Sequence, residues 1–157
     1  MSDEVSAAYL REAVERFRSL RALGEGAIAQ VDDAALGVAL DPESNSIAMI
    51  VNHLAGNMRS RWTDFLTSDG EKPDRNRDAE FEPDAEVTRP RLLARWEAGW
   101  GQVFGALESL RPEDLTRTVR IRGEPLSALE AITRQLAHYA YHVGQIVYLA
   151  KHFASAR

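Results

Sequence analysis

Residues 127–153, SALEAITRQLAHYAYHVGQIVYLAKHF, carry the pattern that decides the fold. Apolar side chains recur along this segment at helical spacing, and Ser127 and Glu130 have the spacing of a capping box at its start. The sequence therefore predicts one long helix here. Two histidines, His138 and His142, interrupt the apolar stripe, and burying either of them costs free energy unless the imidazole has a polar partner.

Three other segments have helical periodicity, namely residues 2–31, 46–66 and 86–110. Gly24 and Gly26 fall within the first of these, where they weaken the helix and permit a local bend. We expect all three segments to be helices that bury one apolar face.

The segments between the helices differ in character. Residues 67–84 form a long polar loop that contains glycine, two prolines and charges of both signs. A loop of this length is either a lid or binding loop, or a mobile connector, and the sequence favours neither interpretation. Residues 116–124 alternate polar and apolar side chains before a glycine turn, which predicts a short extended or hairpin segment. The sequence thus predicts an all-α, antiparallel four-helix bundle that forms a single domain over residues 1–157.

Composition narrows the range of functions. The 157-residue chain has a net charge of −5, and its arginines are interleaved with acidic residues, so no nucleic-acid or membrane partner is expected. Neither a signal peptide nor an apolar run of about 20 residues is visible, so we expect a cytoplasmic protein. The chain contains no cysteine, which excludes disulfides and protein thiolates. Any bound metal must therefore have nitrogen or oxygen ligands.

The histidines are the strongest chemical signal. His138 and His142 lie one helical turn apart, so both imidazoles can reach one ion, although such a pair arises by chance in roughly one chain in ten with four histidines. His53 lies in an equally apolar part of the second predicted helix, and facing helices of a bundle place inward side chains at similar depth. Three neutral nitrogen ligands leave coordination positions open for water or substrate. His152 lies ten residues beyond His142, about 15 Å along the helix, which is too far for the same ion.

Other polar residues share the helical faces of these histidines. Asn57 follows His53 by one turn and either orients a ligand or packs between helices. Arg61 lies further round the same side, where it either meets a substrate carboxylate or pairs at the surface with Asp64 or with the loop. Gln145 is one turn after His142 and is a candidate outer partner of that imidazole. Arg75 and Arg77 are weaker candidates for contact with an anion.

Two stretches resemble the DinB superfamily of four-helix bundles, which includes the YfiT-like proteins. They are PESNSIAMIVNHLAGNMRSRWTDFLTSDGEKPDRNRDAEF at residues 42–81 and HYAYHVGQIVYLAK at residues 138–151, and they are similar to a DinB-like subfamily of unknown function. The resemblance, which covers nearly the whole chain, implies that His53, His138 and His142 bind a divalent ion, most often zinc or nickel. It also implies a homodimer and a metal that activates a low-molecular-weight thiol.

Three functional hypotheses follow. The first is a divalent-metal-dependent enzyme that activates a small thiol for attack on a small-molecule electrophile, as an S-transferase does. The second is a metal-dependent hydrolase that uses metal-bound water. The third is a metal-stabilised bundle that binds a ligand or partner and catalyses nothing. Asn57, Arg61 and Gln145 are the candidate catalytic residues in the first two cases.

Overall fold

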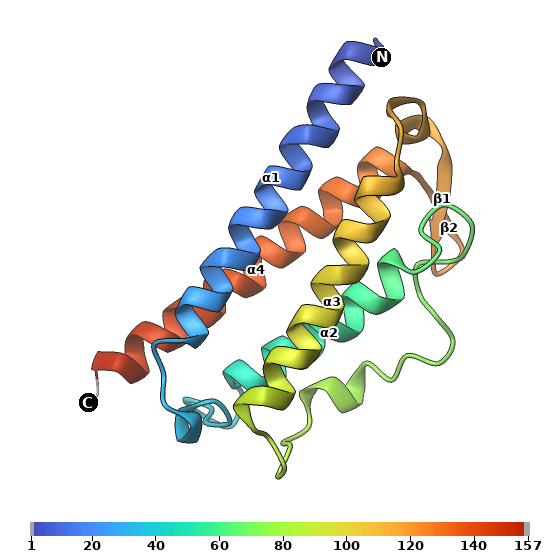
Figure 1. Cartoon of the computed structure of the whole chain (residues 1–157). Coiled ribbons are helices and arrows are strands. Elements are labelled where there is room, and N and C mark those ends of the chain that lie inside the picture. Colours follow the sequence, from blue (N-terminus) through green and yellow to red (C-terminus); the bar gives the residue numbers. More distant parts are fainter. Residues whose placement is uncertain (1, 156–157) are drawn as a thin grey trace.

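The computed structural model describes residues 2–155, and this part of the chain is mostly helical with one small β-hairpin. The long helices are α1 (Asp3–Ile28), α2 (Ile47–Trp62), α3 (Arg89–Ser109) and α4 (Ala128–Ser155). The hairpin consists of β1 (Thr118–Ile121) and β2 (Glu124–Ser127) directly before α4 (Figure 1). Short 3₁₀ segments are η1 (Asp33–Ala35), η2 (Asp78–Phe81) and η3 (Pro112–Thr116). The predictions of four helices and of an extended segment before the last helix are confirmed.

Side-chain caps explain where the helices begin. The predicted capping box is present at α4, where the Glu130 amide donates to Ser127 Oγ at 3.1 Å and the Ser127 amide donates to Glu130 Oε2 at 2.7 Å. Ser46 caps α2 in the same way, because its Oγ accepts from the Met49 amide at 3.2 Å. These contacts satisfy backbone amides that a helix start leaves unpaired.

Helix α2 ends at Trp62 rather than at Leu66 as the periodicity suggests. Thr63 is already extended, and Asp64 has a φ of 49°, so the backbone leaves the helix at this point. The Ser68 hydroxyl then donates to Thr63 O at 3.1 Å. Local bonds from hydroxyl side chains compete with helical ones, which is why the apolar pattern overestimates this helix.

The helices form two parallel pairs that run in opposite directions. Helices α1 and α4 lie side by side, and Tyr9 near the start of α1 donates to Leu129 O near the start of α4 at 3.2 Å. Arg95 early in α3 likewise donates to Asn52 early in α2 at 2.7 Å. The predicted antiparallel arrangement is therefore present between the two pairs, whereas the two helices within each pair run parallel (Figure 1). Residues 63–88 return the chain along α2, so the long loop is a crossover connection.

Aromatic side chains fill the centre of the molecule. Phe17, Trp62, Trp96, Trp100 and Tyr139 are all buried, and the rings of Phe17 and Trp62 meet edge to face at 5.6 Å. Trp96 and Trp100 therefore belong to the core. None of the described helices combines the length and the apolar character needed to span a lipid bilayer.

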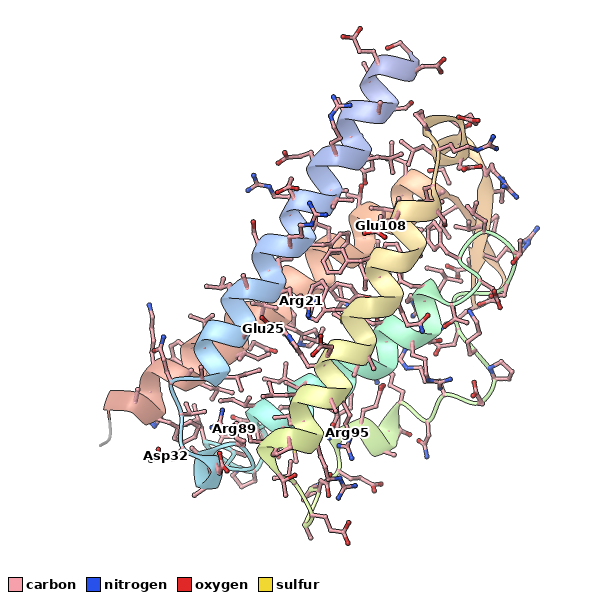
Figure 2. The ribbon with its side chains drawn as sticks, viewed as in Figure 1. Arg21, Glu25, Asp32, Arg89, Arg95 and Glu108 are labelled. Atoms are coloured by element: carbon pink, nitrogen blue, oxygen red, sulfur yellow. The ribbon has the colours of Figure 1, made fainter. Side chains whose placement is uncertain are left out.

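The contact between α1 and α3 explains one of the two glycines of α1. The helix continues through Gly24 and Gly26 and ends at Ile28. A Cβ atom at Gly24 would lie 2.5 Å from the Trp96 ring, so this glycine allows the indole to pack against the α1 backbone. Figure 2 shows Arg21 and Glu25 on the side of α1 that faces α3. At the base of the same contact Arg89 donates to Ile28 O at 2.9 Å.

Candidate metal centre

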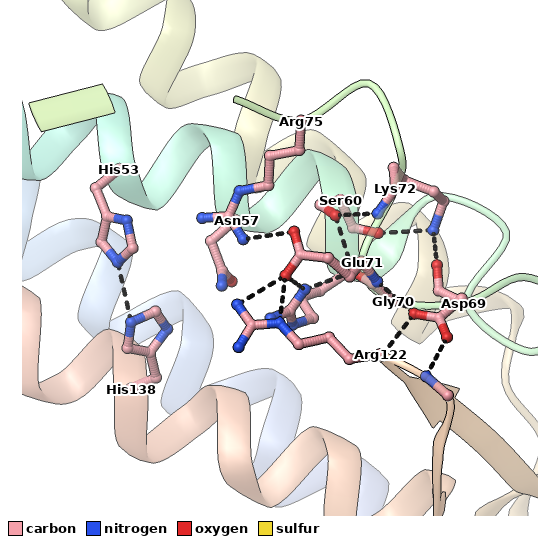
Figure 3. Close-up of polar contacts among 12 residues, drawn as sticks. His53, Asn57, Ser60, Asp69, Gly70, Glu71, Lys72, Arg75, Arg122 and His138 are labelled. Carbon is pink, nitrogen blue, oxygen red and sulfur yellow. Dashed lines mark hydrogen bonds and ion pairs between the residues drawn. The ribbon is translucent and has the colours of Figure 1, made fainter. Parts of the chain in front are cut away.

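Three histidines meet where α2 crosses α4. His53 comes from α2, and His138 and His142 come from successive turns of α4. One ligand nitrogen from each ring lies within 4.8 Å of the other two, and His53 Nε2 is 3.1 Å from His138 Nε2 (Figure 3). His152 is exposed near the end of α4 and is not part of this group. The structure therefore brings together the three histidines that the sequence singles out.

Apolar packing holds the two helices at this crossing. Ile50 and Leu54 on α2 and Val143 and Ile146 on α4 are each at most 1% exposed. Their shape complementarity fixes how α2 and α4 meet, because a closely packed interior resists even small displacements. The histidine side chains are consequently presented to one another by rigid elements.

The surroundings keep the α4 imidazoles neutral. Burial lowers the pKa of His138 to about 3, and the neighbouring His142 and His53 add to this effect. Burial also lowers the pKa of His142. Both rings are thus unprotonated at neutral pH, which is the state in which an imidazole binds a metal.

The donor set fits a divalent transition-metal ion. Gln145 Oε1 accepts from His142 Nδ1 at 2.8 Å, so the free lone pair of this ring is on Nε2. Nitrogens that share one zinc ion at about 2.0–2.1 Å lie roughly 3.3 Å apart, close to the 3.1 Å between His53 and His138. The three histidines could therefore hold a metal ion, and imidazole nitrogens suit zinc, nickel and copper.

The long loop supplies side chains that the sequence does not point to. Phe81 stacks on His53 with ring centroids 4.7 Å apart, and Glu80 Oε1 lies 3.7 Å from His53 Nδ1. Arg75, expected as a possible anion contact, is instead paired with Glu80 at 2.7 Å. Arg77 is exposed and lies over the Phe81 ring. Loop residues carry no periodicity, so no signal in the sequence assigns them to the site.

Asn57 lies in the interior between His53 and the aromatic core. The Tyr139 hydroxyl donates to Asn57 Oδ1 at 2.8 Å and accepts from Trp62 Nε1 at 2.9 Å. This chain of hydrogen bonds links α2 to α4 one turn away from His53. The geometry corresponds to the helix-packing interpretation of Asn57.

Arg61 is buried, not exposed as a surface arginine would be. It donates to Gly70 O at 2.5 Å and pairs with Glu71 at 3.2 Å, so it contacts the loop from the interior and not at the surface. Burial lowers the pKa of its guanidinium. Its guanidinium is thus already paired with a carboxylate of the chain itself.

The ion pairs of Arg61 continue into a network that anchors the crossover loop (Figure 3). Glu71 also pairs with Arg75 at 3.3 Å and with Arg122 of the hairpin turn at 3.1 Å. The Asp69 carboxylate accepts from the backbone amides of Arg122 and Gly123, each at 2.8 Å. These contacts join the loop to α2 and to the hairpin, and they hold Arg75 close to the histidines.

Two cavities border residues that contact the histidines. One of about 620 Å³ borders Gln145 and is lined by apolar and aromatic side chains, namely Leu40, Ile50, Tyr141, Tyr148 and Leu149, and about equally by polar residues. The other, of about 610 Å³, lies between α2, α3 and the crossover loop and borders Gly56 and Glu80. Both have the size of a small-molecule site.

Comparison with known proteins gives a family but no function. The family described as "Protein of unknown function (DUF1572)" matches residues 4–157. None of the curated proteins matches the chain.

Proposed function

The chain belongs to the DUF1572 family, within the DinB-like superfamily, and we propose that it is a divalent-metal-dependent enzyme that joins a small thiol to an electrophile. The observation that carries this proposal is the convergence of His53, His138 and His142. Three neutral ligands keep the full charge of a divalent ion and leave at least one coordination position open, as in catalytic rather than structural sites. The resident ion is proposed to be zinc or nickel.

When bound, the ion supplies a Lewis acid that lowers the pKa of a small thiol or water at its open position. The charges around the histidines favour an anion there. Arg61 and Arg75 act electrostatically on His138, and Arg77 acts on His142. Positive charge stabilises a thiolate more than a neutral ligand, and Glu71 and Glu80 offset part of the charge of Arg61 and Arg75.

One further feature supports a thiol over water as the nucleophile. The chain contains no cysteine, which is compatible with a thiol from a separate molecule and equally with metal-bound water. Glu71 and Glu80, the carboxylates near the histidines, are both paired with arginine and are poorly placed to serve as a general base. Hydrolysis gains more from such a base than attack by a preformed thiolate does.

In the proposed reaction the thiol sulfur forms a bond to an electrophilic carbon of the second substrate. The leaving group departs with its bonding electrons, and the thiol proton passes to solvent. The cavity beside Gln145 is the proposed position of the apolar part of this substrate. Gln145 holds the His142 ring, whereas Asn57 and Arg61 are proposed to shape the site through packing and charge, without contact to the reacting atoms.

The wider assignment is part of the same proposal. Residues 1–157 would form a single DinB-type four-helix bundle that acts as a cytoplasmic homodimer on small molecules. The parallel pairing of α1 with α4 and of α2 with α3 supports a bundle. Tyr141 and Tyr148 on α4 are 63% and 70% exposed, which supports α4 as the dimer face.

Thermal-shift measurements with bacillithiol, mycothiol, glutathione and coenzyme A, each with and without zinc, test the proposal. A thiol that raises Tm only in the presence of zinc, and not for His142→Ala, is the expected result. Turnover of generic esters or amides without any thiol would instead assign a hydrolase. No response to thiols or esters, together with a large fall in Tm on chelation, would assign a metal-stabilised bundle without catalysis.

A further inference from the structure

The side of His53 that faces away from the other histidines meets a buried carboxylate. His53 Nδ1 is completely buried and has no hydrogen-bond partner among residues 2–155. Glu80 Oε1 lies 3.7 Å from this nitrogen, just beyond hydrogen-bond range, and the Glu80 side chain is only 9% exposed. A buried polar atom without a partner requires an explanation, and here an acceptor is less than 1 Å too far away.

The position of Glu80 is built by residues from two segments. Arg75 donates to Glu80 Oε1 from Nη2 at 2.7 Å and from Nε at 3.1 Å, and its own side chain is 3% exposed. On the opposite side the carboxylate rests against Gly56 of α2. A Cβ atom at Gly56 would lie 2.7 Å from Glu80 Cδ, so any other residue there would displace the carboxylate.

The chemistry of the imidazole determines what this carboxylate does. His53 Nε2 faces His138 at 3.1 Å, so Nε2 is the atom that must offer a lone pair to a metal ion. A neutral imidazole that binds through Nε2 carries its proton on Nδ1. That proton then points toward Glu80, and the ion pair with Arg75 holds the carboxylate in position to accept it.

We infer that Glu80 is a positioning residue of the metal centre, which accepts the Nδ1 proton of His53 and thereby holds Nε2 toward the ion. The inference rests on the proposed metal site and deepens it, because it makes the crossover loop part of the centre. Gln145 performs the corresponding role for His142 from within α4. His53 on α2 and His142 on α4 would thus each donate the proton of the nitrogen that does not face the ion to a neighbouring side chain.

Zinc affinity, measured by competition with a chromophoric chelator, tests the inference in full-length protein. Glu80→Gln keeps the shape of the side chain but removes its charge, and we expect zinc affinity to fall by about 10- to 100-fold. Glu82→Gln is the matched control, since it makes the same change two residues away on an exposed side chain, and it should change affinity less than twofold.

Gly56→Ala gives an independent test that does not alter the carboxylate chemically. The added Cβ atom lies too close to Glu80 Oε2 and costs stability in either case, but without a positioning role the zinc affinity of the folded variant should equal that of the parent. The positioning role predicts weaker zinc binding, because the added Cβ displaces Glu80. Gly101→Ala on α3 is the control, since nothing lies within 4 Å of a Cβ atom there. This pair also serves if Glu80→Gln does not fold.

Nitrogen-15 NMR of the imidazoles supplies the decisive signature. In the zinc-loaded protein His53 should carry its proton on Nδ1, with a low-field proton signal that moves upfield in Glu80→Gln. If Glu80→Gln and Gly56→Ala both bind zinc like their controls and the Nδ1 signal is unchanged, Glu80 has no positioning role. Failure of the unaltered protein to bind zinc would instead overturn the proposed metal function.

Discussion

His142 Nδ1 donates to Gln145 Oε1 at 2.8 Å, so two residues of one helical turn settle which nitrogen of the imidazole is free. The free Nε2 is the nitrogen available to the group formed with His53 and His138. Gln145, three residues after His142 on the same helix, therefore supplies the acceptor for the ring proton.

Gln145→Leu removes this acceptor while keeping the size of the side chain. We expect zinc affinity to fall by about 10- to 100-fold with little change in helicity, because the ring loses its preferred tautomer. Competition titration measures the affinity and circular dichroism measures the helicity. Gln102→Leu on the exposed face of α3 is the control, and equal affinities for both variants would contradict the role of Gln145.

His142→Ala removes one of the three nitrogens directly. The metal content of purified protein should fall from about one ion per chain to near zero, because two imidazoles alone bind weakly. Mass spectrometry of the metals after gel filtration measures the content. His152→Ala makes the same change on the same helix outside the group and should retain the ion. Metal content that does not change in His142→Ala would exclude the proposed site.

Helical spacing predicted the parts of this molecule that depend on local sequence. The capping box of Ser127 and Glu130 marked the start of α4, and the i, i+4 relation of His138 and His142 placed both on one face. His53 could be added because an apolar helix face must turn inward. These features follow from the geometry of a helix and from the burial of its apolar face, and both can be inferred from the spacing of residues in a single sequence.

The crossover loop could not be predicted, for a physical reason. Whether α3 starts at the near or the far end of α2 depends on tertiary packing, including the contact of Gly24 with Trp96. Because that direction was unknown, nothing connected Glu80 or Phe81 with His53. Helical spacing placed Arg61 on the same side of α2 as His53. Its burial, however, depends on the crossover loop, which it contacts at Gly70 and Glu71.

The close approach of α1 to α3 predicts opposite effects for two neighbouring glycines. Gly24→Ala introduces a Cβ atom 2.5 Å from the rigid Trp96 ring, so the free energy of unfolding should fall by about 1–3 kcal/mol. Gly26→Ala meets nothing within 4 Å and should stabilise the protein by about 0.5–1 kcal/mol. Urea unfolding measures both. Equal effects at the two positions would show that the helices do not approach as described.

Tyr139→Phe tests whether Asn57 serves the packing of the helices or the metal centre. The change removes the hydroxyl that joins Asn57 Oδ1 to Trp62 Nε1, and it leaves both atoms without that partner in the interior. The free energy of unfolding should fall by about 1–3 kcal/mol. Zinc affinity, measured under conditions where the variant is folded, should stay within twofold of the parent. A large loss of zinc affinity with unchanged stability would instead connect Asn57 with the metal centre.

The neutral histidines predict that the metal-free protein becomes less stable in weak acid. The pKa of His138 is about 3 in the folded state, against about 6.5 in the unfolded state. Between these values the unfolded chain binds a proton that the folded chain does not, so stability is highest above about pH 6.5 and falls as the pH is lowered. His142 shifts in the same direction.

Urea unfolding in the presence of a chelator at pH 7.5, 6.0 and 5.0 measures this dependence. The slope below pH 6 should approach about 1.4 kcal/mol per pH unit from His138, with a further contribution of the same sign from His142, and His138→Asn should reduce it. Glu71, whose pKa is lowered by Arg61 and Arg75 despite the opposing effect of burial, contributes only when the pH falls below about 4.5. The chosen interval therefore isolates the histidines. Stability that stays constant between pH 7.5 and 5.0 would show that these imidazoles are not buried in neutral form.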